Sequence, residues 1–308
     1  MRVTVALPTH NRAGFLRQTL AGVVRQDFPR DQFEILVIDN NSRDDTRAAV
    51  AAFSGETPAP RWILETQQGL DHARNRAIAE AAGEIIILAD DDILVGPDWI
   101  SRMLAPFAAD SGGRIGAVGG EVIPVFPEGL PAWLEGAHTP LAYRPDPGPL
   151  PASQFPMGAN FAFPRAVFEK YGGFHTDLDR QGGRLFSGGD SEMIRRLRSA
   201  GLEIWFAPAA AVRHQIPASR LNLRYALRHA FDSARSRVAE RAGQPRAGGY
   251  LASRFAANLL KAPAFALLAL LNAAILRNGD AKKALVRAWR SCGYLVQILR
   301  SLAGKNSV

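Results

Sequence analysis

The sequence predicts an α/β fold: a single domain with a mostly parallel sheet flanked by helices, followed by a helical, basic C-terminal region. Strand-like and helix-like segments alternate over the first third of the chain, which is typical of such a sheet. The run Glu84–Ala89 (EIIILA) is continuously apolar, as expected for a central strand buried on both faces. The charge also reverses along the chain. Residues 213–308 hold 17 Lys and Arg against 3 Asp and Glu, whereas residues 1–212 hold 20 against 26.

The individual elements follow from local patterns. Apolar runs predict strands at Val3–Leu7, Glu34–Ile38, Trp62–Leu64, Glu84–Ala89, Ile115–Val118, Asn160–Phe163 and Leu202–Phe206. Helical spacing of apolar residues predicts helices at Phe15–Gln26, Thr46–Phe53, Leu70–Ala82, Asp98–Phe107, from Pro164 onward and at Asp190–Ala200. Two segments interrupt the alternation: Pro124–Pro156 contains nine prolines and Gly172–Gly189 six glycines. Because long loops in compact domains are usually functional, both are expected to shape a site.

Composition limits the class of protein. With 308 residues, 47% of them apolar and 21% charged, the chain has globular proportions, which excludes a disordered chain and a fibre. The single cysteine, Cys292, excludes an intramolecular disulfide framework and a zinc site built on several thiolates. The first ten residues show no apolar run behind a charged start, so we expect a protein of the reducing cytoplasm.

The basic C-terminal region carries apolar stretches. Ala262–Leu276 is fifteen residues without a charge, shorter than the ~20 residues of a spanning helix. Ala281–Leu302 places apolar residues on one helical face, flanked by Lys282, Lys283 and arginines, which is the pattern of an interfacial amphipathic helix. We therefore expect residues 215–308 to dock peripherally on the cytoplasmic face of an anionic membrane or on a partner chain. No nucleic-acid partner is expected, because the apolar stretch favours lipid over a duplex groove.

The strongest chemical signal is Asp90-Asp91-Asp92, directly after the apolar strand. Three adjacent carboxylates repel one another unless a cation or several donors offset their charge. Mg²⁺ or Mn²⁺ is held in this way, often between one or two carboxylates and substrate phosphates. The alternative is a solvated acidic turn ahead of the next helix.

Two further polar clusters end the first two strands. Pro8-Thr9-His10-Asn11-Arg12 follows the first, and Asp39-Asn40-Asn41-Ser42 followed by Asp44 and Asp45 closes the second. Functional residues of such sheets gather at these ends, and a carboxylate there can accept a hydrogen bond from a base or ribose. For Asp44 and Asp45 helix capping is favoured. Neither a dinucleotide-binding glycine motif nor a P-loop occurs at a strand end.

Two later candidates are less specific. Asp190 opens a helix after the glycine-rich loop, with Glu192 in its first turn; a carboxylate there could act as a general base, or simply cap the helix. His214 follows the last predicted strand and could be a metal or phosphate ligand, or a structural histidine at the start of the basic region.

Taken in order, these segments resemble the family 2 glycosyltransferases with a GT-A fold. The resemblance runs through VALPTHNR, VIDNNSRDDT, GLDHARN, ILADDD, MGANFAF, SGGDSE and the late Arg213-His214 pair, and covers some two thirds of the chain. It implies a catalytic domain at residues 1–214. It also implies that a nucleotide-sugar donor contacts Pro8, Thr9, Asn11, Arg12, Asp39, Asn41, Arg74, Asp90 and Asp91.

The remaining implied roles complete the site. Asp39 would hold the base of a UDP-type donor, Asp92 and His214 would bind Mn²⁺ or Mg²⁺, and Asn160 and Glu192 would lie on the acceptor side. Asp190 would be the catalytic base of an inverting transfer of one sugar to a hydroxyl in glycan or polysaccharide synthesis. The Q-x-x-R-W pattern of processive synthases is absent, since residues 215–220 are QIPASR.

Two alternatives remain open. A polyprenyl-phosphate glycosyltransferase of the same fold would suit the basic, membrane-seeking tail, and its lipid-linked phosphate acceptor needs no base. A catalytically inactive, membrane-docked binding protein is the second alternative, because Gly189 stands where many relatives have Glu before the catalytic Asp.

Overall fold

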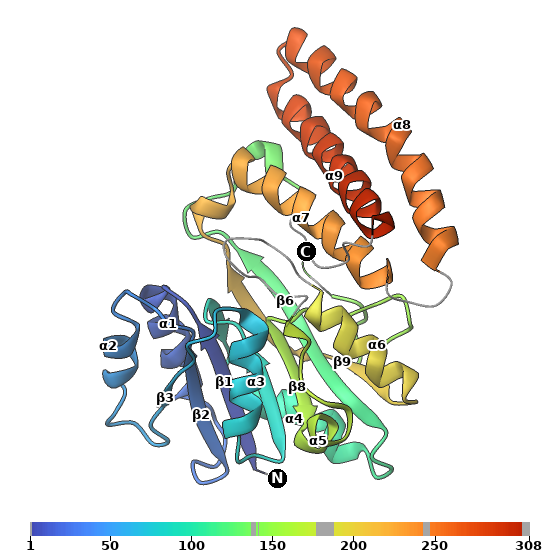
Figure 1. The fold of residues 1–308 in the computed structure, drawn as a ribbon. Helices are drawn as coiled ribbons and strands as arrows, with labels where there is room; N and C mark the ends of the chain where they lie inside the picture. Colours follow the sequence, from blue (N-terminus) through green and yellow to red (C-terminus); the bar gives the residue numbers. More distant parts are fainter. Residues whose placement is uncertain (1, 137–139, 141, 177–187, 243–246, 304–308) are drawn as a thin grey trace. The chain divides into compact units, whose positions relative to one another are not determined.

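The computed structural model describes residues 2–136, 140, 142–176, 188–242 and 247–303 (Figure 1). Its contacts divide into two compact units. Unit 1 comprises Met1–Val125, Thr139–Phe174 and Asp190–Gln215, and unit 2 comprises Phe126–His138, His175–Gly189 and Ile216–Val308.

Unit 1 is built on one nine-stranded sheet with the order β3-β2-β1-β4-β8-β6-β9-β5, to which β7 adds by pairing with β9. The strands are β1 Val3–Thr9, β2 Phe33–Asp39, β3 Arg61–Leu64, β4 Ile85–Ala89, β5 Ile93–Val95, β6 Ile115–Val125, β7 Gly148–Pro149, β8 Asn160–Pro164 and β9 Glu203–Gln215. The α-helices of this part are α1 Ala13–Val23, α2 Thr46–Ala51, α3 Leu70–Glu80, α4 Trp99–Ala109, α5 Arg165–Tyr171 and α6 Gly189–Ser199.

Helices cover both faces of the sheet, as the alternating pattern predicts (Figure 1). Alternate residues of β4 enter different cores: Ile85 and Ile87 pack with α1 and α4, whereas Ile86 and Leu88 pack with α3, α5 and α6. A strand buried on both faces must be apolar throughout, which explains the EIIILA run. The α/β fold with flanking helices is thus confirmed.

The sheet is more mixed than the sequence predicts. Strands β3, β2, β1 and β4 run parallel, but β8 pairs antiparallel with both β4 and β6, and β5 and β7 pair antiparallel with β9. Strands β6 and β9 also continue to Val125 and Gln215, well beyond the predicted ends at Val118 and Phe206. Their parallel pairing, which reaches Val125 opposite Gln215, supplies backbone partners to Gly-, Ala- and Pro-rich sequence with low strand propensity.

The structure describes most of the proline-rich segment Pro124–Pro156 but only the ends of the glycine-rich segment Gly172–Gly189. Among the described residues of Pro124–Pro156, the first two end β6, and one turn of 3-10 helix, η1 (Ala132–Leu134), and the short strand β7 follow. Most of the glycine-rich segment, residues 177–187, lies outside the described residues.

The described part of unit 2 contains three long helices: α7 Leu223–Ala242, α8 Ala247–Ala274 and α9 Asn278–Leu302, with a short 3-10 turn, η3 (Ala218–Arg220), before them. A small core joins them through Ala234, Val238, Leu251, Tyr294 and Ile298. Among the described residues, α8 alone is long and apolar enough to cross a membrane by length and composition, and 11% of its most apolar window is buried.

Candidate functional site

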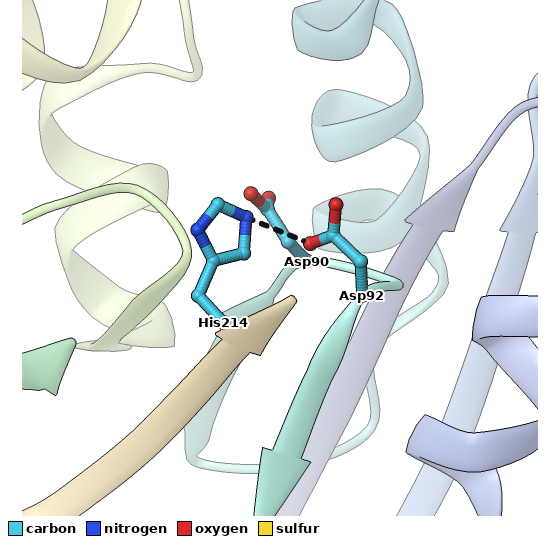
Figure 2. Close-up of side chains that lie close together, drawn as sticks. All are labelled: Asp90, Asp92 and His214. Carbon is cyan, nitrogen blue, oxygen red and sulfur yellow. Dashed lines mark ion pairs between the residues drawn. The ribbon is translucent and has the colours of Figure 1, made fainter. Parts of the chain in front are cut away.

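Asp90, Asp92 and His214 converge at one end of the sheet (Figure 2). Asp90 follows the last residue of β4 and Asp92 precedes β5, while antiparallel pairing places His214 of β9 opposite Ile93. Each side chain offers one ligand atom, and these atoms lie within 4.8 Å of one another. The register of β5 on β9 therefore brings together residues more than 120 positions apart in the sequence.

Asp92 is fully buried and lies between His214 and Arg12. Its Oδ1 is 2.9 Å from Nε2 of His214, and its Oδ2 accepts a hydrogen bond of 2.6 Å from Arg12. Burial opposes ionisation of Asp92, but His214 and Arg12 outweigh it and hold its pKa below the ordinary value. For His214, burial would lower the pKa, but the charges of Asp92 and Asp90 raise it.

Asp91 points to the first strand instead. Its carboxylate accepts hydrogen bonds from the Thr9 hydroxyl at 2.6 Å and from Arg12 at 2.9 Å. Burial, reinforced by the charge of Asp92, raises the pKa of Asp91 to about 6, although Arg12 opposes the shift. The hydroxyl of Thr19 on α1 donates a hydrogen bond to the Asp91 carbonyl at 2.9 Å and so ties the acidic loop to α1. This loop is not the solvated acidic turn of the alternative interpretation.

Asp39 lies beside Thr9, because the parallel register of β1 and β2 pairs these two residues. Its Oδ1 accepts the backbone N–H of Ser42 at 2.9 Å, and its Oδ2 accepts the indole N–H of Trp62 at 3.1 Å. The guanidinium of Arg47 stacks over Trp62, 4.8 Å from the ring centroid. The carboxylate is thereby fixed at the end of β2, and each oxygen keeps one lone pair for another donor.

The other predicted donor-side residues lie at the end of β1 and in the two loops that follow β1 and β2, which are hydrogen-bonded to each other. Pro8 is buried within β1, whereas Asn11 and Asn41 are exposed and adopt left-handed backbone conformations, with φ of 53° and 63°. Asn11 ties the two loops together, because its N–H donates to Ser42 Oγ at 2.9 Å and its Oδ1 accepts the N–H of Arg43 at 2.7 Å.

Arg74 is a buried cation that joins two carboxylates. Its Nη1 lies 3.0 Å from Asp71 and 2.5 Å from Asp190, and its guanidinium stacks against the rings of Phe161 and Phe174. Burial would lower the pKa of Arg74, but the adjacent carboxylates raise it above the ordinary value. The implied donor contact of Arg74 stays a prediction. In the structure the side chain bonds the two carboxylates and, at 3.5 Å, the carbonyl of Gly158.

Asp190 is the more accessible member of this group, with 33% of its side chain exposed. Gly158 approaches it so closely that an added Cβ would lie 2.1 Å from Asp190 Oδ2 and 2.6 Å from Arg74 Nη2. Glu192 pairs with Arg196 one turn along α6, at 3.1 Å.

Asn160 is completely buried, and its amide joins three elements. Its Oδ1 accepts the indole N–H of Trp99 at 3.0 Å, and its Nδ2 donates to the carbonyls of Ala210 at 2.7 Å and Glu121 at 3.2 Å. These bonds cross-link β8 to α4, β6 and β9, so the structure gives the side chain a positioning role. Its acceptor-side assignment stays a prediction that rests on its place in β8.

The sequence did not single out several residues that organise the site. Asp71 is spaced three residues before Arg74 on α3, a spacing that brings helical side chains together. Thr19 is a polar residue on the apolar face of α1, which is a detectable signal. Trp62 carries no such signal, because its contact with Asp39 depends on strand pairing.

The donor set suits a hard or borderline divalent cation. The two carboxylates provide the oxygen ligands that Mn²⁺ and Mg²⁺ prefer, and the imidazole adds a nitrogen ligand that a borderline ion accepts. The set contains no thiolate, which a thiophilic ion would favour. Asp92 has its pKa lowered and is available as an anion. The neighbouring strand ends carry Thr9 and Asp39, and Arg12 follows in the loop before α1. An anionic ligand bound to the ion would lie next to these residues.

Comparison with known proteins now identifies the family. Glycosyl transferase family 2 matches residues 4–172, more than half of the chain. The chain is also similar to glycosyltransferase AglE of Haloferax volcanii, with 28% identity over 207 residues, covering 67% of this chain and 64% of that protein. It thus spans somewhat less than two thirds of that curated relative.

Solved structures share the fold over nearly the whole chain. The mannosyltransferase PcManGT from Pyrobaculum calidifontis, in complex with GDP-Man and Mn²⁺, has a TM-score of 0.65 and 24% identity, covering 99% of this chain and 88% of that one. S. aureus TarS 1-349 in complex with UDP has a TM-score of 0.56 and 15% identity, covering 99% and 92%. With the expected fold confirmed and the family matched over more than half of the chain, the chain belongs to glycosyl transferase family 2.

Proposed function

We propose that this glycosyltransferase is metal-dependent and inverting, and that it moves one sugar from a nucleoside-diphosphate donor, UDP-type, to a hydroxyl of a glycan acceptor. The observation that carries the proposal is the cluster of Asp90, Asp92 and His214 beside Arg12. Structural relatives bind GDP-Man with Mn²⁺ or bind UDP, which supports a nucleotide-sugar donor while leaving the base to experiment.

The metal and the surrounding side chains would share the charge of the leaving group. Asp92 and His214, with Asp90 beside them, would hold Mn²⁺ or Mg²⁺, which supplies Lewis-acid stabilisation of a departing diphosphate. Arg12 would balance the acidic loop, because it already bonds Asp91 and Asp92. Asp39 would accept an N–H of the base, and Thr9 and Asp91 would face the donor from the ends of β1 and β4.

Asp190 would take the proton of the acceptor hydroxyl. It is partly exposed, and Arg74 holds one of its oxygens, so the carboxylate is oriented without being shielded from a substrate. General-base assistance contributes about 10²–10⁴ in rate. Attack from the face opposite the leaving group in a single displacement would invert the anomeric centre.

Asp190→Asn tests this role. We expect turnover to fall by about 10²–10⁴ while donor affinity is retained, because Asp190 faces the acceptor and not the nucleotide. The measurements are initial rates of sugar transfer and calorimetric titration with donor and Mn²⁺. Asp98→Asn, an exposed carboxylate paired with Arg102 on α4, is the matched control. Near-normal turnover of Asp190→Asn would show that Asp190 is not the base.

A donor screen tests the nucleotide assignment. Each nucleotide sugar is added with Mn²⁺ to the wild type and to Asp92→Asn, and the melting temperature is recorded. A bound ligand at about 100 times its Kd stabilises the folded state by about 2.7 kcal/mol, so the correct donor should raise the melting temperature only when Asp92 is present. An equal response in Asp92→Asn would contradict the metal assignment.

A lipid-linked phosphate acceptor is the second candidate, favoured by the apolar helix α8 and the excess of basic residues after residue 212. Such an acceptor needs no base, so Asp190→Asn would then retain transfer. Organic extraction distinguishes the two candidates, because a polyprenyl-phosphate product enters the lipid phase and a glycan product stays in water.

A catalytically inactive binding protein is the third candidate and rests on Gly189. Glu192 forms an ion pair with Arg196. Glu192 therefore does not replace the negative charge that many relatives carry at the position of Gly189. Hydrolysis of the bound donor in the absence of acceptor would exclude an inactive site. For either active candidate we propose that residues 1–214 form the catalytic domain on the cytoplasmic side and that residues 215–308 attach it peripherally to the membrane.

A further inference from the structure

Helix α8 presents a large apolar surface to solvent. Six leucines of this helix are between 42% and 74% exposed: Leu259, Leu260, Leu267, Leu268, Leu270 and Leu271. Isolated exposed leucines are ordinary, but a contiguous patch of this kind marks an interaction surface. The patch lies within unit 2, and α8 packs on α9 along its other side.

The width of the patch indicates what covers it. At 3.6 residues per turn, the six leucines spread over about half of the helix circumference. The buried residues Leu251, Asn258, Ala269 and Asn272 occupy the remaining side. A seam for one partner helix is a narrower stripe, whereas a lipid surface accepts a broad apolar face. The patch therefore favours a bilayer over a second copy of the chain.

The neighbouring helix carries charge complementary to an anionic bilayer. Helix α9 lies alongside α8 (Figure 1) and bears Lys282, Lys283, Arg287 and Arg290. The guanidinium of Arg287 stacks 5.7 Å from the ring centroid of Phe265. Basic side chains beside an apolar helix face suit the headgroup level of acidic lipids.

The same contact makes a crossing orientation of the packed hairpin costly. Phe265 lies within the charge-free segment Ala262–Leu276, which at 1.5 Å per residue spans about 22 Å, less than the ~30 Å of hydrocarbon. If α8 crossed the bilayer with α9 beside it, Arg287 would be carried to membrane depth, which is costly for a charge. An orientation parallel to the surface avoids this cost.

The turn between the helices adds a shallow, open hollow of about 460 Å³. It is lined by Trp133 of η1, Leu276, Arg277 and Lys283, with Arg277 paired to Asp280 at 3.2 Å. An aromatic ring, an exposed leucine and two cations together fit the boundary between headgroups and acyl chains.

We propose that α8 lies in the plane of an anionic membrane surface, with its leucine face in the acyl region and the cations of α9 at the headgroups. This inference rests on the peripheral attachment proposed above and specifies its element, depth and orientation. Within the described part of the chain, α8 is the helix that could cross a membrane by composition, and the proposal gives it a surface position instead.

Vesicle flotation of the full-length protein tests the contact. With about 30% phosphatidylserine in phosphatidylcholine, the wild type should float, and binding should weaken with salt. Leu270→Glu should reduce the vesicle-bound fraction by about tenfold or more. Leu64→Glu is the matched control, because it replaces a leucine of β3 that is 42% exposed. This variant should leave the vesicle-bound fraction unchanged. Equal binding of Leu270→Glu and wild type would overturn the proposal.

Cysteine accessibility tests the orientation. In a Cys292→Ser background, Arg254→Cys and Leu276→Cys place a thiol near each end of α8. In sealed vesicles both thiols should react with an impermeant maleimide added outside. Protection of one end until detergent is added would show a crossing helix and overturn the surface position.

Sedimentation without lipid tests the competing occupant. A dimer that Leu270→Glu dissociates, together with no vesicle binding by the wild type, would assign the leucine face to a second copy of the chain. Donor hydrolysis is measured on the same preparations, and because vesicle binding needs neither donor nor Mn²⁺, failure of the docking proposal and failure of the transferase proposal give different results.

Discussion

Buried charges decide the geometry of the site at the scale of single residues. Arg74 lies with two carboxylates and two aromatic rings around it, so its removal would leave Asp71 buried without this partner. Loss of one member of a buried ion pair typically costs about 3–5 kcal/mol. We expect Arg74→Gln to lower the free energy of unfolding by an amount near this range, measured by urea denaturation.

The helix that carries Arg74 also provides its control. Arg76 is exposed and pairs with Glu80 one turn away, and such surface pairs are worth about 0.3–0.5 kcal/mol. Arg76→Gln should therefore change stability little. Similar losses in the two variants would mean that the buried cluster has no special energetic role.

Gly158 supports the same cluster sterically. Gly158→Ala should displace the Asp190 carboxylate, because the added carbon would lie within 2.1 Å of Oδ2. We expect the rate of sugar transfer to fall. Because the added carbon would also lie 2.6 Å from Nη2 of Arg74, titration with the donor additionally tests the implied donor contact of Arg74. Gly14→Ala on α1 meets no atom within 4 Å and is the matched control.

Local sequence could identify Asp39, Asp90 and Asp92, because each ends or follows a recognisable strand. It could not pair Arg74 with Asp190, since this contact spans 116 positions and depends on how α6 packs on the sheet. Asn160 shows the same limit: its place in a strand was predictable, but its complete burial follows from Trp99 and Ala210.

At the scale of elements, Asp44 lies in the loop between β2 and α2 but also caps helix α1, which follows β1. Its carboxylate accepts the N–H of Ala13, the first residue of α1, at 2.9 Å, and the N–H of Thr46 at 3.1 Å. Slight burial opposes ionisation, but these hydrogen bonds lower the pKa of Asp44 below its ordinary 3.8. The capping predicted for this residue therefore serves α1 as well as α2.

Asp44→Ala should lower stability by about 1 kcal/mol at neutral pH. Because the folded pKa is depressed, this contribution is present above the unfolded pKa and is lost as the pH falls through the folded value. Denaturation from about pH 5 to about pH 3 should show the difference between variant and wild type shrinking. Asp45, which makes no side-chain cap bond to α2, provides the control Asp45→Ala; a difference that grows on acidification would contradict the assignment.

Element type was predictable from periodicity, but element length was set by tertiary pairing. Strand β9 contains Pro208 and a run of alanines that would suit a helix, yet it pairs with β5, β6 and β7 as far as Gln215. Helix α8 begins fifteen residues before the charge-free segment, because its packing on α9 extends the helix beyond the apolar pattern.

At the scale of the whole molecule, the charge asymmetry parallels the two compact units. The acidic excess lies in residues 1–212 and the basic excess in residues 213–308, and each unit has its own buried cluster. Ligand binding slows hydrogen exchange chiefly by suppressing the opening of the unit that binds. Two ligands of different chemistry should therefore protect different segments.

Hydrogen exchange on the full-length protein checks this separation. UDP-sugar with Mn²⁺ should slow exchange around Thr9–Arg12, Asp39 and Asp90–Asp92, whereas anionic vesicles should slow it in α8 and α9. In Asp92→Asn the first pattern should disappear and the second should remain, because the lipid contact uses no residue of the acidic loop. If the vesicles instead protected the acidic loop as strongly as the donor does, acidic phosphate groups would be binding at the metal cluster, and the separate assignment of the two surfaces would be wrong.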